Sequence, residues 1–162
     1  EKETGKHPII GLSVTRDVQD SILANPQYAA VVDLIDIRYW HYQADGTLYA
    51  PQGGQSLAPR QHARLLKPKK TSFEQVYRAV KEYRDKFPGK AIMYSGDSYP
   101  EFGIAAFMAG GSLCSLPESV SQEMLQLAAG MKPVASGNKE YKLSNGNKSI
   151  LYNTNTKTIT IQ

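Results

Sequence analysis

Five consecutive polar and aromatic residues follow a hydrophobic run, and they are the first candidates for a binding site. Residues 31–37 are mostly β-branched or aliphatic, which predicts a strand buried on both faces of a sheet. The side chains that follow can stack on a ligand or hydrogen-bond to it: Arg38, Tyr39, Trp40, His41 and Tyr42. Ligands of parallel α/β sheets bind beyond the carboxyl ends of the strands, so we expect a binding-site wall here. The alternative is that Tyr39, Trp40 and Tyr42 pack beneath the following loop.

Polar residues also follow a second predicted strand, residues 90–95. The turn after it carries two carboxylates and an aromatic ring, those of Asp97, Glu101 and Tyr99. We expect these side chains at the same edge of the sheet as Trp40, because parallel strands end there together. Each carboxylate also has a simpler interpretation. Asp97 suits a turn that caps the next helix, and Glu101 suits the first turn of that helix, where it favours the dipole.

Composition narrows the classes of partner. The chain has 162 residues, of which 41% are hydrophobic, enough for a globular core. The net charge of +4 is mild and mostly scattered, which argues against nucleic acid. Ten tyrosines suit stacking on carbohydrate or nucleobases. One cysteine, Cys114, excludes an internal disulfide, and no apolar run reaches the ~18 residues of a membrane helix.

The elements that must position these residues alternate along the chain. Strands are predicted at residues 8–15, 33–40, 90–95 and 112–115, and helices at 17–23, 26–30, 71–87, 102–109 and 119–131. Asp17 is expected to cap the first of these helices, and Asn25 the second, with Pro26 at its first position. The clearest helix begins with a Thr71–Glu74 capping box. A loop of unusual length, residues 43–70, carries Arg60 and His62, which either clamp an acidic sugar or belong to a solvated loop.

This order predicts an α/β fold with parallel strands and right-handed crossovers. Two architectures remain open: a small doubly wound sheet, or half of an eight-stranded (β/α)8 barrel. Residues 141–152 read as a hairpin with an Asn-Gly turn, and residues 157–161 as a further strand. Because barrel enzymes commonly carry an appended sandwich, this tail favours the partial barrel. We expect residues 1–133 to form the half barrel and residues 134–162 to begin an accessory β-sandwich.

Three motifs carry a resemblance to a known family. They are Lys90-Ala-Ile-Met-Tyr-Ser-Gly-Asp97, the Ala109-Gly-Gly111 turn and the hairpin after Tyr141. With them, residues 8–117 resemble the second half of a clan A TIM-barrel glycoside hydrolase. The resemblance is closest to the apiosidase-like and collagenase-like polysaccharide-degradation proteins of bacteria. It implies a secreted or periplasmic protein that acts on polysaccharide or oligosaccharide.

By this resemblance Asp97 occupies the position of the nucleophilic glutamate, with a side chain one methylene shorter. Glu101 is then a second candidate carboxylate, since retaining and inverting glycosidases both need a pair. The acid/base glutamate of the family would precede Glu1. The resemblance therefore implies that an N-terminal half of the same protein completes the site. The alternative is a catalytically silent barrel that binds carbohydrate through the same aromatic residues.

No cofactor or metal is expected. The histidines His7, His41 and His62 lack metal-ligand spacing, and Asp33 and Asp36 are expected to serve at strand ends. Glycine pairs occur at residues 53–54 and 110–111, but neither fits a phosphate-binding loop, so a nucleotide is not expected either.

Overall fold

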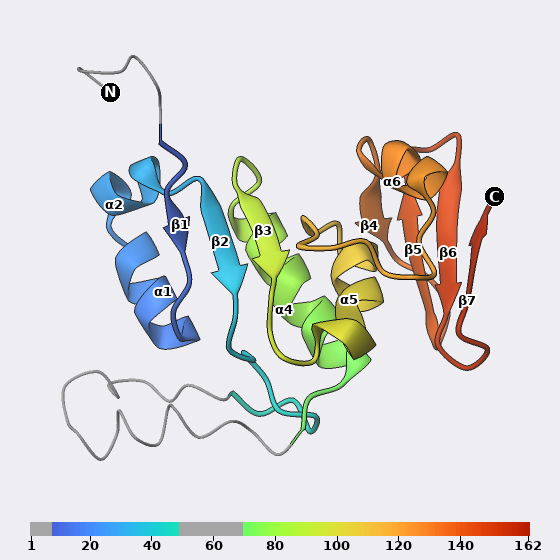
Figure 1. Ribbon diagram of the computed structural model, residues 1–162, viewed down its shortest axis with the longest axis horizontal. Helices are drawn as coiled ribbons and strands as arrows, with labels where there is room; N and C mark the ends of the chain where they lie inside the picture. The colour runs from blue at the N-terminus through green and yellow to red at the C-terminus, as the bar shows by residue number, and fades with distance from the viewer. Residues whose placement is uncertain (1–7, 49–69) are drawn as a thin grey trace.

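The computed structural model describes residues 8–48 and 70–162, and these form two sheets with helices between them (Figure 1). The first part contains β1 (Gly11–Leu12), α1 (Arg16–Leu23), α2 (Pro26–Val31), β2 (Leu34–Ile37), α4 (Phe73–Lys86), β3 (Ala91–Tyr94) and α5 (Tyr99–Met108). The second contains α6 (Gln122–Ala128), β4 (Lys132–Val134), β5 (Glu140–Ser144), β6 (Ser149–Asn153) and β7 (Thr158–Ile161). The α/β class expected from the sequence is confirmed.

The first sheet is parallel, with the strand order β1-β2-β3. Beyond β3, Ser112 forms a single parallel bridge to Met93, where the sequence predicted a strand at 112–115. The predicted strands therefore lie parallel and adjacent in chain order, but they are shorter than expected. One reason is that the chain turns early into the next element: Thr15 caps α1 three residues after β1.

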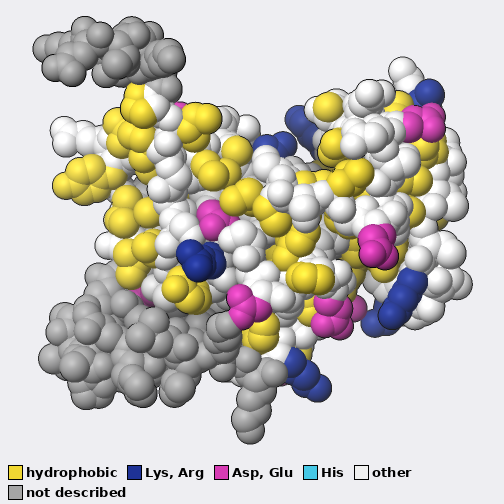
Figure 2. Space-filling view, in the orientation of Figure 1, with side chains coloured by type: hydrophobic (Ala, Val, Ile, Leu, Met, Phe, Trp, Pro, Cys, Tyr) yellow, Lys and Arg dark blue, Asp and Glu magenta, His cyan; other side chains and the backbone are white. Residues whose placement is uncertain are grey.

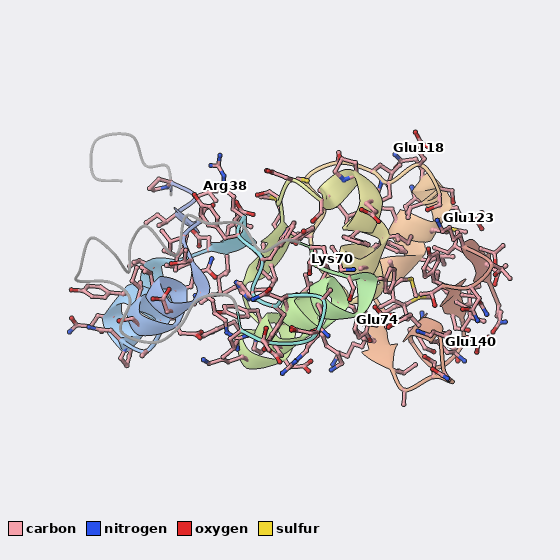
Figure 3. All side chains as sticks on the ribbon, turned by 90° about the horizontal axis from the view of Figure 1, so that it is seen from below. Arg38, Lys70, Glu74, Glu118, Glu123 and Glu140 are labelled. Carbon is pink, nitrogen blue, oxygen red and sulfur yellow. The ribbon has the colours of Figure 1, made fainter. Side chains whose placement is uncertain are left out.

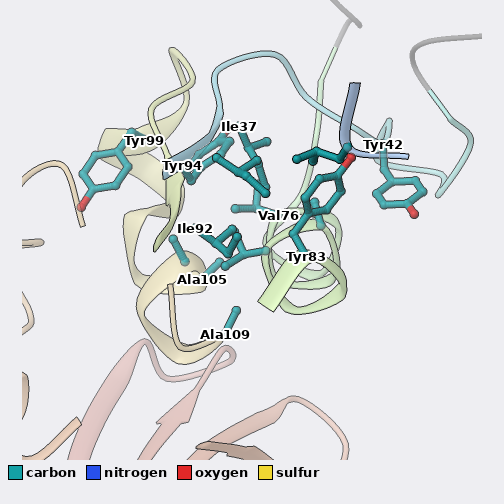
Figure 4. Packing of buried hydrophobic residues seen from close by; sticks show 14 of the residues in the cluster. Ile37, Tyr42, Val76, Tyr83, Ile92, Tyr94, Tyr99, Ala105 and Ala109 are labelled. Atoms are coloured by element: carbon teal, nitrogen blue, oxygen red, sulfur yellow. The ribbon is translucent and has the colours of Figure 1, made fainter. Parts of the chain in front are cut away.

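The helices of the first part pack on one face of the parallel sheet. Ile35, Ile37, Ile92 and Tyr94 are buried against α4 and α5 (Figure 4). Because side chains alternate along a strand, Leu34, Asp36, Ala91 and Met93 lie on the opposite face. Helix α1 belongs to the same layer as α4, since the Tyr83 hydroxyl donates to Asp20 Oδ1 at 2.7 Å. This arrangement, with sequentially ordered strands and helices on one face, differs from a doubly wound sheet, which has helices on both faces. No closed barrel exists within residues 8–48 and 70–162.

The second sheet is antiparallel, with the order β4-β5-β6-β7. The predicted hairpin is confirmed, and Gly146 in its turn has a φ of 92°, a conformation that glycine adopts without steric cost. The sheet begins at Lys132, directly after the predicted helix 119–131, of which only α6, Gln122–Ala128, is helical in the structure. Its inner face packs on α5 through Leu143, Ile150 and Tyr152. Helix α5 is therefore buried from Gly103 to Met108, because it lies between the two sheets.

Two predicted helix caps are wrong by one or two residues. Ser72, not Thr71, caps α4 by accepting a hydrogen bond from the Gln75 amide. The Thr71 hydroxyl instead donates to the Tyr42 carbonyl at 3.1 Å, which joins the residues before α4 to those after β2. Asp17 lies in the first turn of α1 rather than at its cap. The Asn25-Pro26 start of α2 is confirmed.

Candidate functional site at the carboxyl end of the parallel sheet

Asp36 lies at the centre of the carboxyl end of the parallel sheet. Its Oδ2 accepts hydrogen bonds from Ser13 Oγ and Ser95 Oγ, both at 2.8 Å. These serines follow β1 and β3, so the carboxylate joins the ends of all three strands. The side chain is only 8% exposed, and its Oδ1 atom has no hydrogen-bond partner among the described residues. Figure 2 shows charged side chains of both signs near this end of the sheet.

A buried carboxylate oxygen without a donor is unfavourable by about 1–3 kcal/mol. Oδ1 is itself buried, so a ligand hydroxyl would donate to it only after neighbouring side chains move. The sequence assigned Asp36 only a role at a strand end. The available signal was a charged residue between Ile35 and Ile37 in an otherwise apolar strand, since charged residues are rarely buried without a partner.

His41 faces the protein interior and pairs with Gln19, which binds the main-chain carbonyl of Asp36, so the predicted contact of His41 with substrate is not supported. Gln19 Nε2 donates to the Asp36 carbonyl at 2.8 Å, and Gln19 Oε1 lies 3.1 Å from His41 Nε2. Since that amide oxygen can only accept, His41 Nε2 carries the hydrogen. Burial, with a smaller contribution from the charge of Arg16, lowers the pKa of His41 to about 3. The imidazole is therefore neutral.

Tyr42 also belongs to the core and not to a binding-site wall. It is 3% exposed, and its hydroxyl donates to Glu82 Oε2 at 2.5 Å. The guanidinium carbons of Arg16 and Arg78 lie 4.8 and 4.0 Å from the centre of its ring. Burial is the main cause of the raised pKa of Tyr42. Tyr42 therefore packs against α1 and α4, and whether the loop at 49–69 covers it lies outside the described residues.

Trp40 remains at the sheet edge. Its indole Nε1 donates to Ser98 Oγ at 2.9 Å, and the Tyr94 hydroxyl also pairs with Ser98 Oγ. The ring is half-buried. Asp97 precedes Ser98 and is exposed, so the structure brings the predicted nucleophile to the same edge as Trp40.

Arg38 and Tyr39 lie between β2 and Trp40. Arg38 is exposed and projects away from α4 (Figure 3), whereas Tyr39 is half-buried. We call Asp36, Arg38, Trp40, Asp97 and Ser98 the rim site. It combines a buried carboxylate with an exposed planar cation, an exposed carboxylate and a half-buried indole at the carboxyl end of the sheet.

Tyr99 and Glu101 lie in a different place from the rim site. Both line a cleft between the start of α5 and the antiparallel sheet. Tyr99 is 9% exposed, and its hydroxyl donates to the Ser115 carbonyl. The expectation that Trp40, His41, Asp97 and Glu101 share one edge thus holds for Trp40 and Asp97. It fails for His41, which is buried, whereas Glu101 lines the neighbouring cleft.

The remaining predicted residues, Arg60 and His62, lie outside the described residues. Within the described ranges no group of three or more histidine, cysteine or acidic side chains is placed to hold a metal ion. No helix in this part of the chain is long and apolar enough to cross a membrane.

Comparisons with known proteins identify a family for this chain. No curated protein and no solved structure is detectably similar to this chain. A family model described as a domain of unknown function, DUF6298, matches residues 1–131, which end immediately before β4. Because this match covers most of the 162 residues, the chain belongs to the DUF6298 family.

Proposed function

We propose that the rim site binds carbohydrate and forms part of a glycoside hydrolase whose catalytic domain is a (β/α)8 barrel. The observation that carries this proposal is the Asp36 carboxylate, which is buried between two serine hydroxyls and keeps one oxygen without a donor. The sequential parallel strands, with helices on one face, support the barrel. An N-terminal half of the same protein would supply the remaining strands.

The chemistry of the rim site suits a sugar. A pyranose offers hydroxyl acceptors to the exposed Arg38 guanidinium, and it can stack on the half-buried indole of Trp40. A sugar hydroxyl would donate to the buried Asp36 Oδ1 only after neighbouring side chains move. Trp40 is held by Ser98 before any ligand arrives, so less side-chain freedom is lost on binding. Ser13 and Ser95 hold Asp36 in the same way.

Asp97 bears on the choice between hydrolysis and binding alone. Its position after the strand favours hydrolysis, whereas its side chain, one methylene shorter than the glutamate of the family, favours binding alone. Its carboxylate is exposed beside Ser98, and it follows the strand that resembles the nucleophile strand of the family. In a retaining reaction such a carboxylate attacks the anomeric carbon while a second carboxyl group protonates the leaving oxygen. The resemblance places that second group before Glu1. The alternative is a catalytically silent carbohydrate-binding barrel, which keeps the same rim site.

Fluorescence of Trp40 tests the proposal directly, because it is the only tryptophan in the chain. We expect neutral oligosaccharides, such as xylo- and cello-oligosaccharides, to change its emission in a saturable way. Asp36→Asn should weaken binding about ten-fold or more, since the amide replaces one carboxylate acceptor oxygen at the centre of the rim site. A matched control is Asp85→Asn on the outer surface of α4, which should bind as the wild type does. Absence of any saturable change with these sugars would contradict the proposal.

A further inference from the structure

A cleft of about 480 Å³ lies between the start of α5 and the antiparallel sheet. Its walls come from three segments: the first turns of α5, the chain at 115–119, and the β6–β7 hairpin. Figure 2 shows charged side chains of both signs across this boundary. The volume is in the range typical of small-molecule sites, about 300–1,000 Å³, which often occur where two structural units meet.

Three charged side chains line the cleft, those of Glu101, Glu118 and Lys157. All three are exposed, and within the described ranges none makes a salt bridge or a side-chain hydrogen bond. By contrast, other acidic residues of the same chain are paired, for example Glu74 with Lys139 at 3.6 Å. The cleft therefore offers two acceptors and one donor that are available to a ligand.

The aromatic walls of the cleft are fixed. The Tyr99 hydroxyl donates to the Ser115 carbonyl, which ties the start of α5 to the segment that follows Ser112. On the other wall the ring of Tyr152 stacks on Phe73 of α4, with ring centres 5.2 Å apart and planes 16° from parallel. Tyr99 and Tyr152 are both more than nine-tenths buried. The cleft is thus held open by contacts to the core on both sides.

The cleft begins one residue after the rim site in the chain, although no rim-site residue lines it. Ser98, which holds Trp40, is followed directly by Tyr99, which lines the cleft. Figure 3 shows Arg38 of the rim site and Glu118 of the cleft on the same side of the molecule, away from α4. The two places therefore face the same side of the molecule.

The charged side chains that line the cleft favour some classes of ligand over others. Two carboxylates disfavour an acidic sugar or a phosphate, while Lys157 disfavours a simple cation. A neutral sugar suits all three groups, because each hydroxyl both donates and accepts, whereas a carboxylate only accepts and an ammonium only donates. We propose that the cleft binds further residues of a neutral, linear polysaccharide chain whose adjoining part occupies the rim site. This inference rests on the proposed function of the rim site.

Replacing Lys157 by asparagine is expected to leave the stability of the protein unchanged. The Lys157 backbone φ of 54° is left-handed, a conformation that asparagine adopts more readily than lysine. Lys157→Asn therefore removes the ammonium group from the cleft without backbone strain. Lys139 is a matched control, since its φ is 64° and it does not line the cleft. Glu118→Gln removes one carboxylate charge at nearly constant shape.

The experiment measures binding of xylo- and cello-oligosaccharides, from disaccharide to hexasaccharide, by calorimetry and by Trp40 fluorescence. We expect the hexasaccharide to bind more tightly than the disaccharide. The double variant Lys157→Asn, Glu118→Gln should lose about ten-fold in hexasaccharide affinity, close to the value of one charge-assisted hydrogen bond, and nothing in disaccharide affinity. Lys139→Asn should leave both affinities unchanged.

The possible results separate the two proposals. If chain length has no effect, or if the double variant keeps the full hexasaccharide affinity, the cleft proposal is overturned and the rim site stands. If the hexasaccharide releases heat without a change in Trp40 emission, the continuous site is overturned, and so is sugar binding at the rim. If no sugar releases heat or changes the emission, both proposals fail.

Discussion

The indole nitrogen of Trp40 lies 2.9 Å from the hydroxyl oxygen of Ser98, which is 58 residues further along the chain. This hydrogen bond joins the segment after β2 to the segment after β3. It therefore determines where the indole lies relative to Asp97, the residue before Ser98. The same hydroxyl pairs with Tyr94, whose pKa burial raises to about 12, so that this phenol stays protonated at neutral pH.

Ser98→Ala should release the indole of Trp40. We expect a longer emission wavelength for Trp40 in the absence of ligand, because the ring becomes more mobile and more hydrated. The free energy of unfolding should fall by about 1 kcal/mol, a typical value for one hydrogen bond. Ser119→Ala is the control, since this serine is exposed. An unchanged emission spectrum in Ser98→Ala would show that Ser98 does not hold the indole.

His41 should make the protein less stable in mild acid. Its folded-state pKa is about 3, below the ordinary value of 6.5. Below pH 6.5 the unfolded chain binds a proton that the folded protein excludes, so stability falls as the pH falls from 6.5 toward 3. The slope should approach about 1.4 kcal/mol per pH unit for this one group.

The comparison is between the wild type and His41→Gln, each unfolded by urea at several values between pH 7 and pH 5. Carboxylates, His7 and His62 are common to both proteins, so their contributions cancel in the difference. We expect His41→Gln to be the less stable protein at pH 7, because a buried contact is lost, and to show the smaller loss toward pH 5. If the free energies of unfolding of the two proteins fell equally between pH 7 and pH 5, His41 would titrate normally and would not be buried.

Gly111 should tolerate no side chain. A Cβ atom there would lie 2.8 Å from Val80 Cγ1 and 2.9 Å from the Ala106 carbonyl oxygen. Gly111→Ala should therefore lower the free energy of unfolding by about 1–3 kcal/mol, the usual effect of overpacking. Gly130 has nothing within 4 Å of the corresponding position, so Gly130→Ala is the control and should be near neutral. If urea unfolding gave Gly111→Ala the same free energy of unfolding as the wild type, Gly111 would not be packed closely against α4 and α5.

Much of this fold follows from local patterns in the sequence. The alternation of strands and helices predicts the parallel order of β1, β2 and β3, and the Asn-Gly pair predicts the β5–β6 hairpin. Strand β4 was missed because three residues that include Pro133 have no readable periodicity, and they become a strand only by pairing with β5. Its formation depends on tertiary contacts.

The candidate site was harder to predict, because side-chain direction depends on long-range partners. Trp40 and His41 are neighbours, yet one is held at the edge by Ser98 and the other is buried against Gln19. Nothing in residues 38–42 distinguishes them. The charge of Asp36 in an apolar strand is visible in the sequence. Its two hydrogen-bond donors are not, because Ser13 lies 23 residues before it and Ser95 lies 59 residues after it. Only the assembled sheet brings these three residues together.

The last prediction concerns turnover: residues 1–162 alone should not hydrolyse glycosides, whereas a chain that includes the preceding barrel strands should. General acid catalysis contributes about 10²–10⁴-fold, and it needs a carboxyl group placed on the leaving oxygen. Glu101 does not provide that group in our proposal, because it lines the cleft beside Tyr99. An aryl-glycoside panel compares this chain, the longer chain and the longer chain with Asp97→Asn. Turnover by residues 1–162 would contradict the half-barrel proposal. Equal turnover with and without Asp97→Asn would exclude Asp97 from the reaction and favour a site that binds sugar without cleaving it.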